Sequence, residues 1–132
     1  MRTKHTLTLE EAKSVALAAQ DKAQRNSWPV VIAIVDDAGH LLYFQRDLAQ
    51  LGSIDVAIQK AKAAALFKRP TKFWEDLISA GAQGYLVMPG MLPIEGGLPI
   101  IKEGQCFGAI GVSGVLSSED GKVAAAGLRA LD

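Results

Sequence analysis

The 132-residue chain has little of the material from which several classes of protein are built. It holds one cysteine, Cys106, so neither an intrachain disulfide nor a cysteine-based zinc site can form. Its 14 basic and 14 acidic side chains cancel, whereas a nucleic-acid-binding protein usually carries a basic excess. The polar residues 1–7 do not resemble a signal peptide, and no apolar run approaches the ~20 residues of a membrane helix. We therefore expect a cytoplasmic protein that binds neither nucleic acid nor a membrane.

Motifs for catalysis are also scarce. The chain has two histidines, His5 and His40, and Ser113 lacks the G-x-S-x-G setting, so nothing indicates a Ser-His-Asp hydrolase. The glycines of residues 108–114 follow G-x-x-G-x-x-G spacing, which differs from the G-x-G-x-x-G fingerprint of dinucleotide-binding folds. No complete catalytic site is present, so the sequence leaves open whether the protein is an enzyme.

What the chain does have is apolar material, much of it alanine. Hydrophobic residues make up 49% and charged residues 21%, a balance typical of a globular protein. The length predicts a single domain over residues 1–132, with enough chain to bury a sizeable core. Alanine buries little area and there are few aromatic residues, so such a core gains from a partner subunit. We expect a homo-oligomer, a dimer or larger.

The first half of the chain predicts a helix followed by a β-hairpin. Thr8 and Glu11 have the spacing of a capping box, and apolar residues then recur at helical intervals. The β-branched run of residues 30–35 predicts a buried central strand. A turn at residues 36–39 leads into a returning strand at 41–44, which completes the hairpin.

The second half predicts further helices and strands in alternation. The expected elements are a helix from Ser53 to Pro70, a short helix from Thr71 to about Ala80, a loop over 81–95, strands at 98–101 and 106–112, and a final helix capped by Ser117 with Asp120. Adjacent hairpins imply an antiparallel sheet, and the amphipathic helices must cover it. The fold class predicted from the residues is α+β.

Several short blocks, in this order and spacing, carry a resemblance to a known family. The blocks are Ile34-Val35-Asp36-x-x-Gly39, Arg46-Asp47 with Ser53-x-x-x-Ala57-x-x-Lys60-Ala61, Gly96-Gly97-x-Pro99-Ile100, residues 108–114, and Asp120 with residues 124–127. From about Leu7 to Leu131 the chain resembles the GlcG/HbpS-like family, which includes the C-terminal domain of PduO-type proteins.

The resemblance implies a fold and a range of functions. It implies about five antiparallel strands flanked by helices, a profilin/PAS-like α-β-α arrangement, often in higher oligomers built from dimers. Some members bind haem, and others are encoded with enzymes of small-acid or diol catabolism. We therefore expect a small-molecule-binding protein whose leading ligand is haem or a related tetrapyrrole, accessory to a catabolic pathway. Secreted haem-binding members carry a signal peptide and extra histidines, which this chain lacks.

Thr71 is the candidate contact to haem iron. It follows Pro70 at the break between two predicted helices, and the resemblance implies an axial contact at this Pro-Thr position. The alternative is that its hydroxyl caps the following helix. Arg46 and Lys60 are candidate partners for haem propionates or for a small organic acid. The alternative for both is a structural salt bridge to Asp36, Asp47 or Asp55.

Two further residues complete the expected cofactor site. Gly97 leaves bare backbone that a flat ligand or a helix could approach, and Ser113 directly follows the strand predicted at 106–112. A second hypothesis is an enzyme, a lyase, isomerase or hydrolase, acting on a small organic acid. In that case Asp36, Lys60 and Asp120 are the candidate catalytic residues. A third is a non-catalytic assembly protein.

Overall fold

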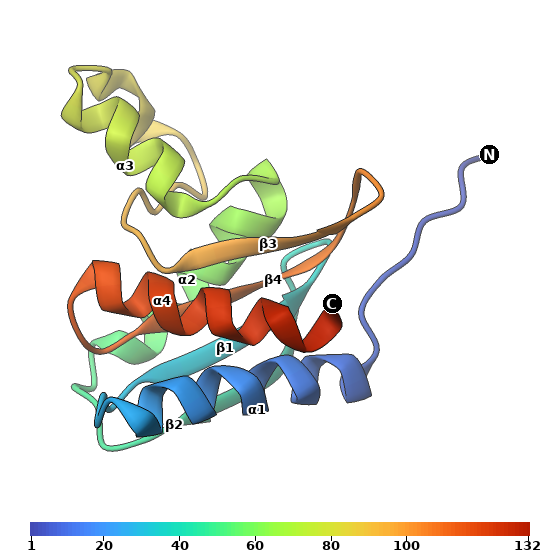
Figure 1. Ribbon diagram of the computed structural model, residues 1–132. Helices are drawn as coiled ribbons and strands as arrows, with labels where there is room; N and C mark the ends of the chain where they lie inside the picture. The colour runs from blue at the N-terminus through green and yellow to red at the C-terminus, as the bar shows by residue number, and fades with distance from the viewer.

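The computed structural model describes residues 1–132 and is built on an antiparallel sheet (Figure 1). Its strands are β1 (Val31–Asp36), β2 (Leu41–Arg46), β3 (Gly97–Lys102) and β4 (Gln105–Ser113), in the spatial order β2-β1-β4-β3. Every neighbouring pair is antiparallel, as predicted. The sheet has four strands, one fewer than the family resemblance implied.

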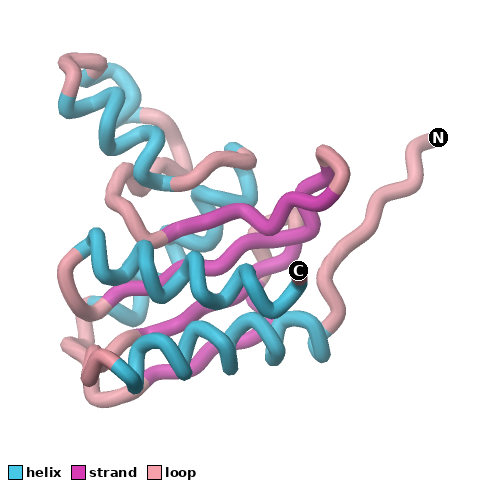
Figure 2. Tube along the Cα trace, in the orientation of Figure 1, coloured by secondary structure: helices cyan, strands magenta, loops and turns pink.

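Helices cover both faces of the sheet, which confirms the α+β class. Helices α1 (Leu9–Arg25) and α4 (Ser117–Leu128) lie side by side on one face, and α2 (Ser53–Phe67) lies on the other (Figures 1 and 2). A 3-10 turn, η2 (Arg129–Leu131), ends the chain against α1. None of these helices is long and apolar enough to span a membrane.

Strand β1 is apolar from Val31 to Val35 because both of its faces are buried there. Ile32 and Ile34 point to the core beneath α1 and α4, while Val31, Ala33 and Val35 point to the core beneath α2. Alternate residues of a strand face opposite sides of a sheet, so two cores require an unbroken apolar run. This is the physical origin of the β-branched run seen in the sequence.

Helix α2 lies very close to strand β4. A side chain at Gly111 would meet the backbone carbonyl of Ala57 and, at 2.5 Å, the backbone nitrogen of Ala61. Glycine on the strand and alanine on the helix therefore let the two backbones approach. Small residues on this face of α2 serve close packing of the protein's own layers.

Of the helix caps predicted at Thr8 and at Ser117, the structure contains only the first. The box at α1 is confirmed, since Glu11 N–H donates to Thr8 Oγ1 at 3.1 Å and Thr8 N–H donates to Glu11 Oε1 at 2.9 Å. The cap predicted for Ser117 is wrong, because Leu116 is the N-cap residue and Ser117 makes no capping bond. Asp120 instead turns its carboxylate inward to accept the Val115 N–H at 3.2 Å.

An arm projects from the body between α2 and β3. It consists of α3 (Thr71–Ser79), a 3-10 turn η1 (Gln83–Val87) and the loop of residues 88–96 that leads to β3 (Figure 1). Lys68, in the left-handed conformation, and Pro70 separate α3 from α2. Only Thr71 and Trp74 of α3 are buried, so these two side chains anchor the helix.

Candidate functional site

Most of the residues expected to form a site meet where β3 begins. Lys60 reaches this point from α2, Thr71 from α3, Asp120 from α4, and Gly97 and Ser113 from the two strands. Hydrogen bonds and close contacts link Lys60, Thr71, Gly97 and Asp120 into one connected group. The candidate site therefore joins three helices to one edge of the sheet.

Lys60 and Asp120 form a buried ion pair at the centre of this group. Each side chain is 2% exposed, and Lys60 Nζ donates to Asp120 Oδ2 at 3.2 Å and to the Val112 carbonyl at 3.0 Å. Burial raises the pKa of the Asp120 carboxyl above its ordinary value, while the Lys60 ammonium and the Val115 N–H oppose that shift. The pair links α2 to α4 across the end of the sheet.

Gly96 provides the space that this ammonium occupies. A Cβ at Gly96 would lie 2.7 Å from Lys60 Nζ and 2.6 Å from the Val112 carbonyl oxygen, and its φ of +132° is one that glycine tolerates. The salt-bridge interpretation of Lys60 therefore holds, but its partner is Asp120. The partners suggested by the sequence, Asp36, Asp47 and Asp55, were wrong because they are not within reach of this pocket.

Thr71 does not cap α3, contrary to the alternative drawn from the sequence. Pro70 is the N-cap residue, and Thr71 is the first residue of the helix, with no exposed surface. Its hydroxyl oxygen accepts the Gly97 N–H at 2.9 Å. Gly97 is in turn held close, since a Cβ there would meet the Lys60 carbonyl and lie 2.8 Å from Thr71 Cγ2. The hydroxyl thus ties the arm to the first residue of β3.

Ser113 directly follows Val112, whose carbonyl accepts from Lys60, whereas Asp36 and Arg46 lie away from this group. Ser113 is buried and its hydroxyl bonds Ser53 Oγ at 3.2 Å. Asp36 accepts the N–H groups of Ala38 and His40, both at 2.9 Å, and so shapes the β1–β2 turn. Asp36 is five residues along β1 from the residue that pairs with Ser113, so it lies about 17 Å along the strand from the level of Ser113.

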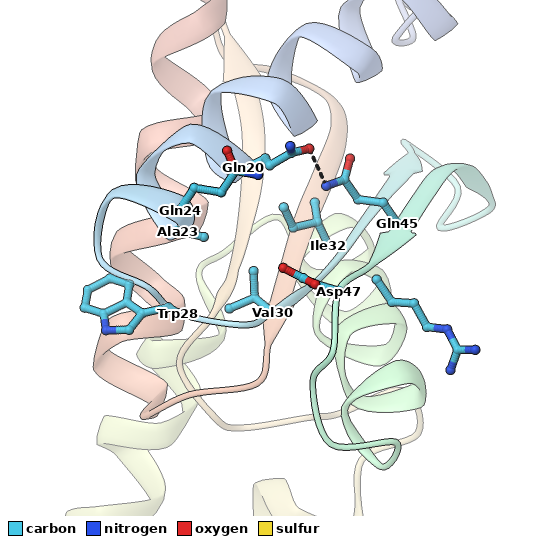
Figure 3. Close-up of a pocket in the computed structure, with 9 residues that line it drawn as sticks. Gln20, Ala23, Gln24, Trp28, Val30, Ile32, Gln45 and Asp47 are labelled. Atoms are coloured by element: carbon cyan, nitrogen blue, oxygen red, sulfur yellow. Dashed lines mark hydrogen bonds between the residues drawn. The ribbon is translucent and has the colours of Figure 1, made fainter.

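Arg46 lies on β2, at the opposite edge of the sheet from β3. It pairs with Val31, which pairs with Ser113, so two strand spacings, about 10 Å, divide Arg46 from Ser113. Its guanidinium is exposed and forms no salt bridge with an acidic residue. Arg46 lines a different cavity, between α1 and β2 (Figure 3).

An aromatic cluster on the arm, next to Thr71, was not singled out from the sequence. Trp74 stands at its centre, with ring centroids 5.5 Å from Phe67, 5.1 Å from Phe73 and 5.0 Å from Tyr85. Half of the eight aromatic residues are therefore gathered here. Their concentration within residues 67–85 was the available signal, in a chain otherwise poor in aromatics.

The aromatic cluster also carries a positive charge and an unpaired donor. The Arg69 guanidinium lies 4.5 Å from the Phe73 ring centroid and 5.6 Å from that of Trp74, a cation–π arrangement. Trp74 Nε1 is the buried side-chain nitrogen that has no hydrogen-bond partner. A buried donor without a partner costs about 1–3 kcal/mol. Beside Thr71, the arm thus offers aromatic surface, a cation and a free N–H.

Comparison with known proteins places these features in a family. The family model described as "Haem degrading protein HbpS-like" matches residues 7–129. The chain is 39% identical to Protein GlcG of Escherichia coli K12 over 115 residues, which cover 86% of this chain and 85% of GlcG. The match therefore runs through the sheet, the ion pair and the arm.

Solved structures agree with the sequence match. A double mutant of Streptomyces reticuli HbpS superposes with a TM-score of 0.90 at 31% identity, covering 100% of this chain and 91% of that one. A structure described as a PduOC:heme complex superposes with a TM-score of 0.85 at 27% identity, covering 95% and 94%. The four-stranded sheet and its flanking helices are thus shared with these proteins.

Proposed function

Because the chain belongs to the HbpS-like family, we propose that it is a haem-binding protein whose site lies on the arm, at the junction of α2 and α3. The family description refers to haem, and one structural neighbour is described as a haem complex. These relatives support haem as the class of ligand. The position of the site rests on the side chains of the arm.

The aromatic cluster fits what haem requires of a protein. Haem presents a flat apolar macrocycle with two carboxylates, and Phe73 and Tyr85 offer aromatic surface around the buried Trp74, beside the Arg69 guanidinium. The observation that carries the proposal is the unpartnered Nε1 of Trp74. Once α3 moves to admit haem, a propionate would accept this buried N–H and remove the cost of leaving it unpaired.

Thr71 would supply the oxygen nearest the iron. Its hydroxyl is buried and accepts the Gly97 N–H, so a contact with a ligand requires α3 to move away from β3. Only Thr71 and Trp74 anchor α3 by burial, which keeps the cost of that movement low. When bound, haem supplies an iron centre whose reactivity depends on the axial ligand and on the polarity around it.

The buried ion pair of Lys60 and Asp120 holds the elements around the site in place. Lys60 and Asp120 fix the start of β3 against α2 and α4, and Gly97 presents the N–H that Thr71 holds. With both charges 2% exposed and paired to each other, a positioning role is favoured over direct acid–base catalysis. We therefore favour an accessory role in a catabolic pathway, in which Asp36, Lys60 and Asp120 catalyse no reaction.

A haemin titration of tryptophan variants tests where the ligand binds. We expect wild type to give a saturable one-to-one Soret spectrum, and Trp74→Phe to weaken the affinity about tenfold, since the phenyl ring lacks the N–H that pairs with a carboxylate. Trp28→Phe is the matched control, because Trp28 lies on the other face of the sheet. The proposal fails if no saturable spectrum forms, or if both variants bind haemin as wild type does.

A further inference from the structure

A second cavity lies at the opposite edge of the sheet from the arm. It has a volume of about 280 Å³ and opens between the C-terminal half of α1 and the strands β1 and β2 (Figure 3). Strands β2 and β3 form the two edges of the sheet, so this cavity is separate from the proposed haem site.

The floor of this cavity is apolar and one end is closed by amides. Ala23, Val30 and Ile32, each at most 5% exposed, form the floor. Gln45 Nε2 donates to Gln20 Oε1 at 2.8 Å, which joins β2 to α1 above the floor (Figure 3). This bond uses the Gln45 amide nitrogen, and the Gln45 amide oxygen has no hydrogen bond to the protein.

Asp47 brings a negative charge to this surface. Figure 3 shows its carboxylate directed into the cavity above Val30, facing the side of α1 that carries Ala23 and Gln24. No lysine, arginine or histidine pairs with it. The carboxylate therefore lacks a cationic partner within the protein.

The carboxylate is also held in position before any ligand arrives. Asp47 N–H donates to the Val30 carbonyl at 3.2 Å, Leu48 N–H donates to Asp47 Oδ1 at 2.7 Å, and Ala49 N–H donates to the Asp47 carbonyl at 2.7 Å. These bonds fix the backbone and one carboxylate oxygen, and leave Oδ2 free. A group oriented in advance loses little entropy when it binds a ligand.

We propose that this cavity binds a small organic ammonium ion. Its charged nitrogen would be held by Asp47 Oδ2 and by side-chain amide oxygens, and its hydrocarbon part would lie on Ala23, Val30 and Ile32. The volume lies just below the roughly 300–1,000 Å³ of most small-molecule sites, which favours a ligand of a few carbon atoms. A carboxylate ligand would instead place its charge against that of Asp47.

Three probes of equal length distinguish the charge that the cavity prefers. Butylammonium, butanol and butyrate are titrated into ¹⁵N-labelled protein, and the Trp28 indole and Gln24 side-chain signals are followed by NMR. We expect saturable shifts with butylammonium and at least about tenfold weaker binding of butanol and butyrate, since a hydrogen bond between two charged groups is worth more than one to a neutral group. Tighter binding of butyrate would overturn the proposal, because Arg46 would then be the anchor.

Two isosteric substitutions test the role of Asp47. Asp47→Asn keeps an oxygen that can accept the Leu48 N–H, so the local fold is retained while the charge is lost. We expect it to weaken butylammonium binding at least about tenfold. Asp55→Asn removes an exposed carboxylate outside the cavity and should leave the affinity unchanged. Equal binding to wild type and Asp47→Asn, or no saturable shift in wild type, would contradict the inference.

Discussion

Lys60 is a charged residue in an environment that usually holds apolar side chains. Its side chain is almost fully buried, yet its ammonium has two acceptors, the Asp120 carboxylate and the Val112 carbonyl. Removing charges from water is costly, and a buried pair recovers that cost only when its hydrogen bonds are satisfied. The pair is therefore sensitive to the loss of either partner.

Replacing Lys60 by methionine should destabilise the fold by about 3–5 kcal/mol at neutral pH, because Asp120 is left buried and unpaired. The pKa of Asp120 is already raised by burial. The penalty is therefore absent below the ordinary carboxyl pKa of 3.8 and grows as the pH rises through the higher folded-state value. Urea unfolding of wild type and Lys60→Met at about pH 4 and about pH 7 measures both effects.

Lys122→Met is the control for the loss of a lysine charge, since Lys122 is exposed on α4. It should change the free energy of unfolding by less than about 0.5 kcal/mol. If Lys60→Met lowers the free energy of unfolding as much near pH 4 as near pH 7, the buried Asp120 charge is not the cause of the destabilisation.

At the scale of elements, the close approach of α2 and β4 depends on Gly111. A methyl group there would collide with the backbone of Ala57 and Ala61, so the helix must move outward. Gly111→Ala should cost about 1–3 kcal/mol or more, as overpacking of cores does. Thermal unfolding compares it with Gly84→Ala, where no atom lies within 4 Å of the new methyl group. Equal melting temperatures for the two variants would refute the packing account.

The regular elements could be predicted because local sequence determines them. The run at 30–35 indicated a strand buried on both faces, and Thr8 with Glu11 indicated where α1 begins. The cap assigned to Ser117 failed because Leu116 is the N-cap residue of α4, and its N–H donates to the Glu119 carboxylate. The cap assigned to Thr71 failed because a tertiary contact took priority, since Thr71 bonds Gly97. Such contacts join positions far apart in the sequence.

The sequence predicted most residues of the candidate site, but it did not predict which of them contact one another. Lys60, Thr71, Gly97 and Asp120 were named from the sequence, and the structure brings them together. The aromatic cluster around Trp74 was missed, because Tyr85 joins it only through the fold of the arm. Spacing along the chain cannot show which rings meet across a turn.

At the scale of the whole molecule, the alanine-rich core and the exposed apolar side chains predict that copies of the chain associate into an oligomer. Several large apolar side chains are exposed: Leu48 by 93%, Leu51 by 74%, Val87 by 86% and Leu116 by 69%. Exposed apolar surface of this kind, where it is contiguous, marks interaction sites. Sedimentation velocity at micromolar concentration should therefore show a dimer or larger species. A single monomeric species across the concentration range would contradict this expectation.

The central claim is that haem binds at the α2–α3 junction with Thr71 as its oxygen donor. The measurement that tests it most directly is haemin affinity, by Soret titration, in Thr71→Ala and Thr71→Ser. Serine retains the hydroxyl and should bind haemin nearly as wild type does, whereas alanine should weaken binding roughly tenfold or more. Circular dichroism confirms that both variants are folded. Unchanged affinity in Thr71→Ala, or an equal loss in both variants, would contradict the account.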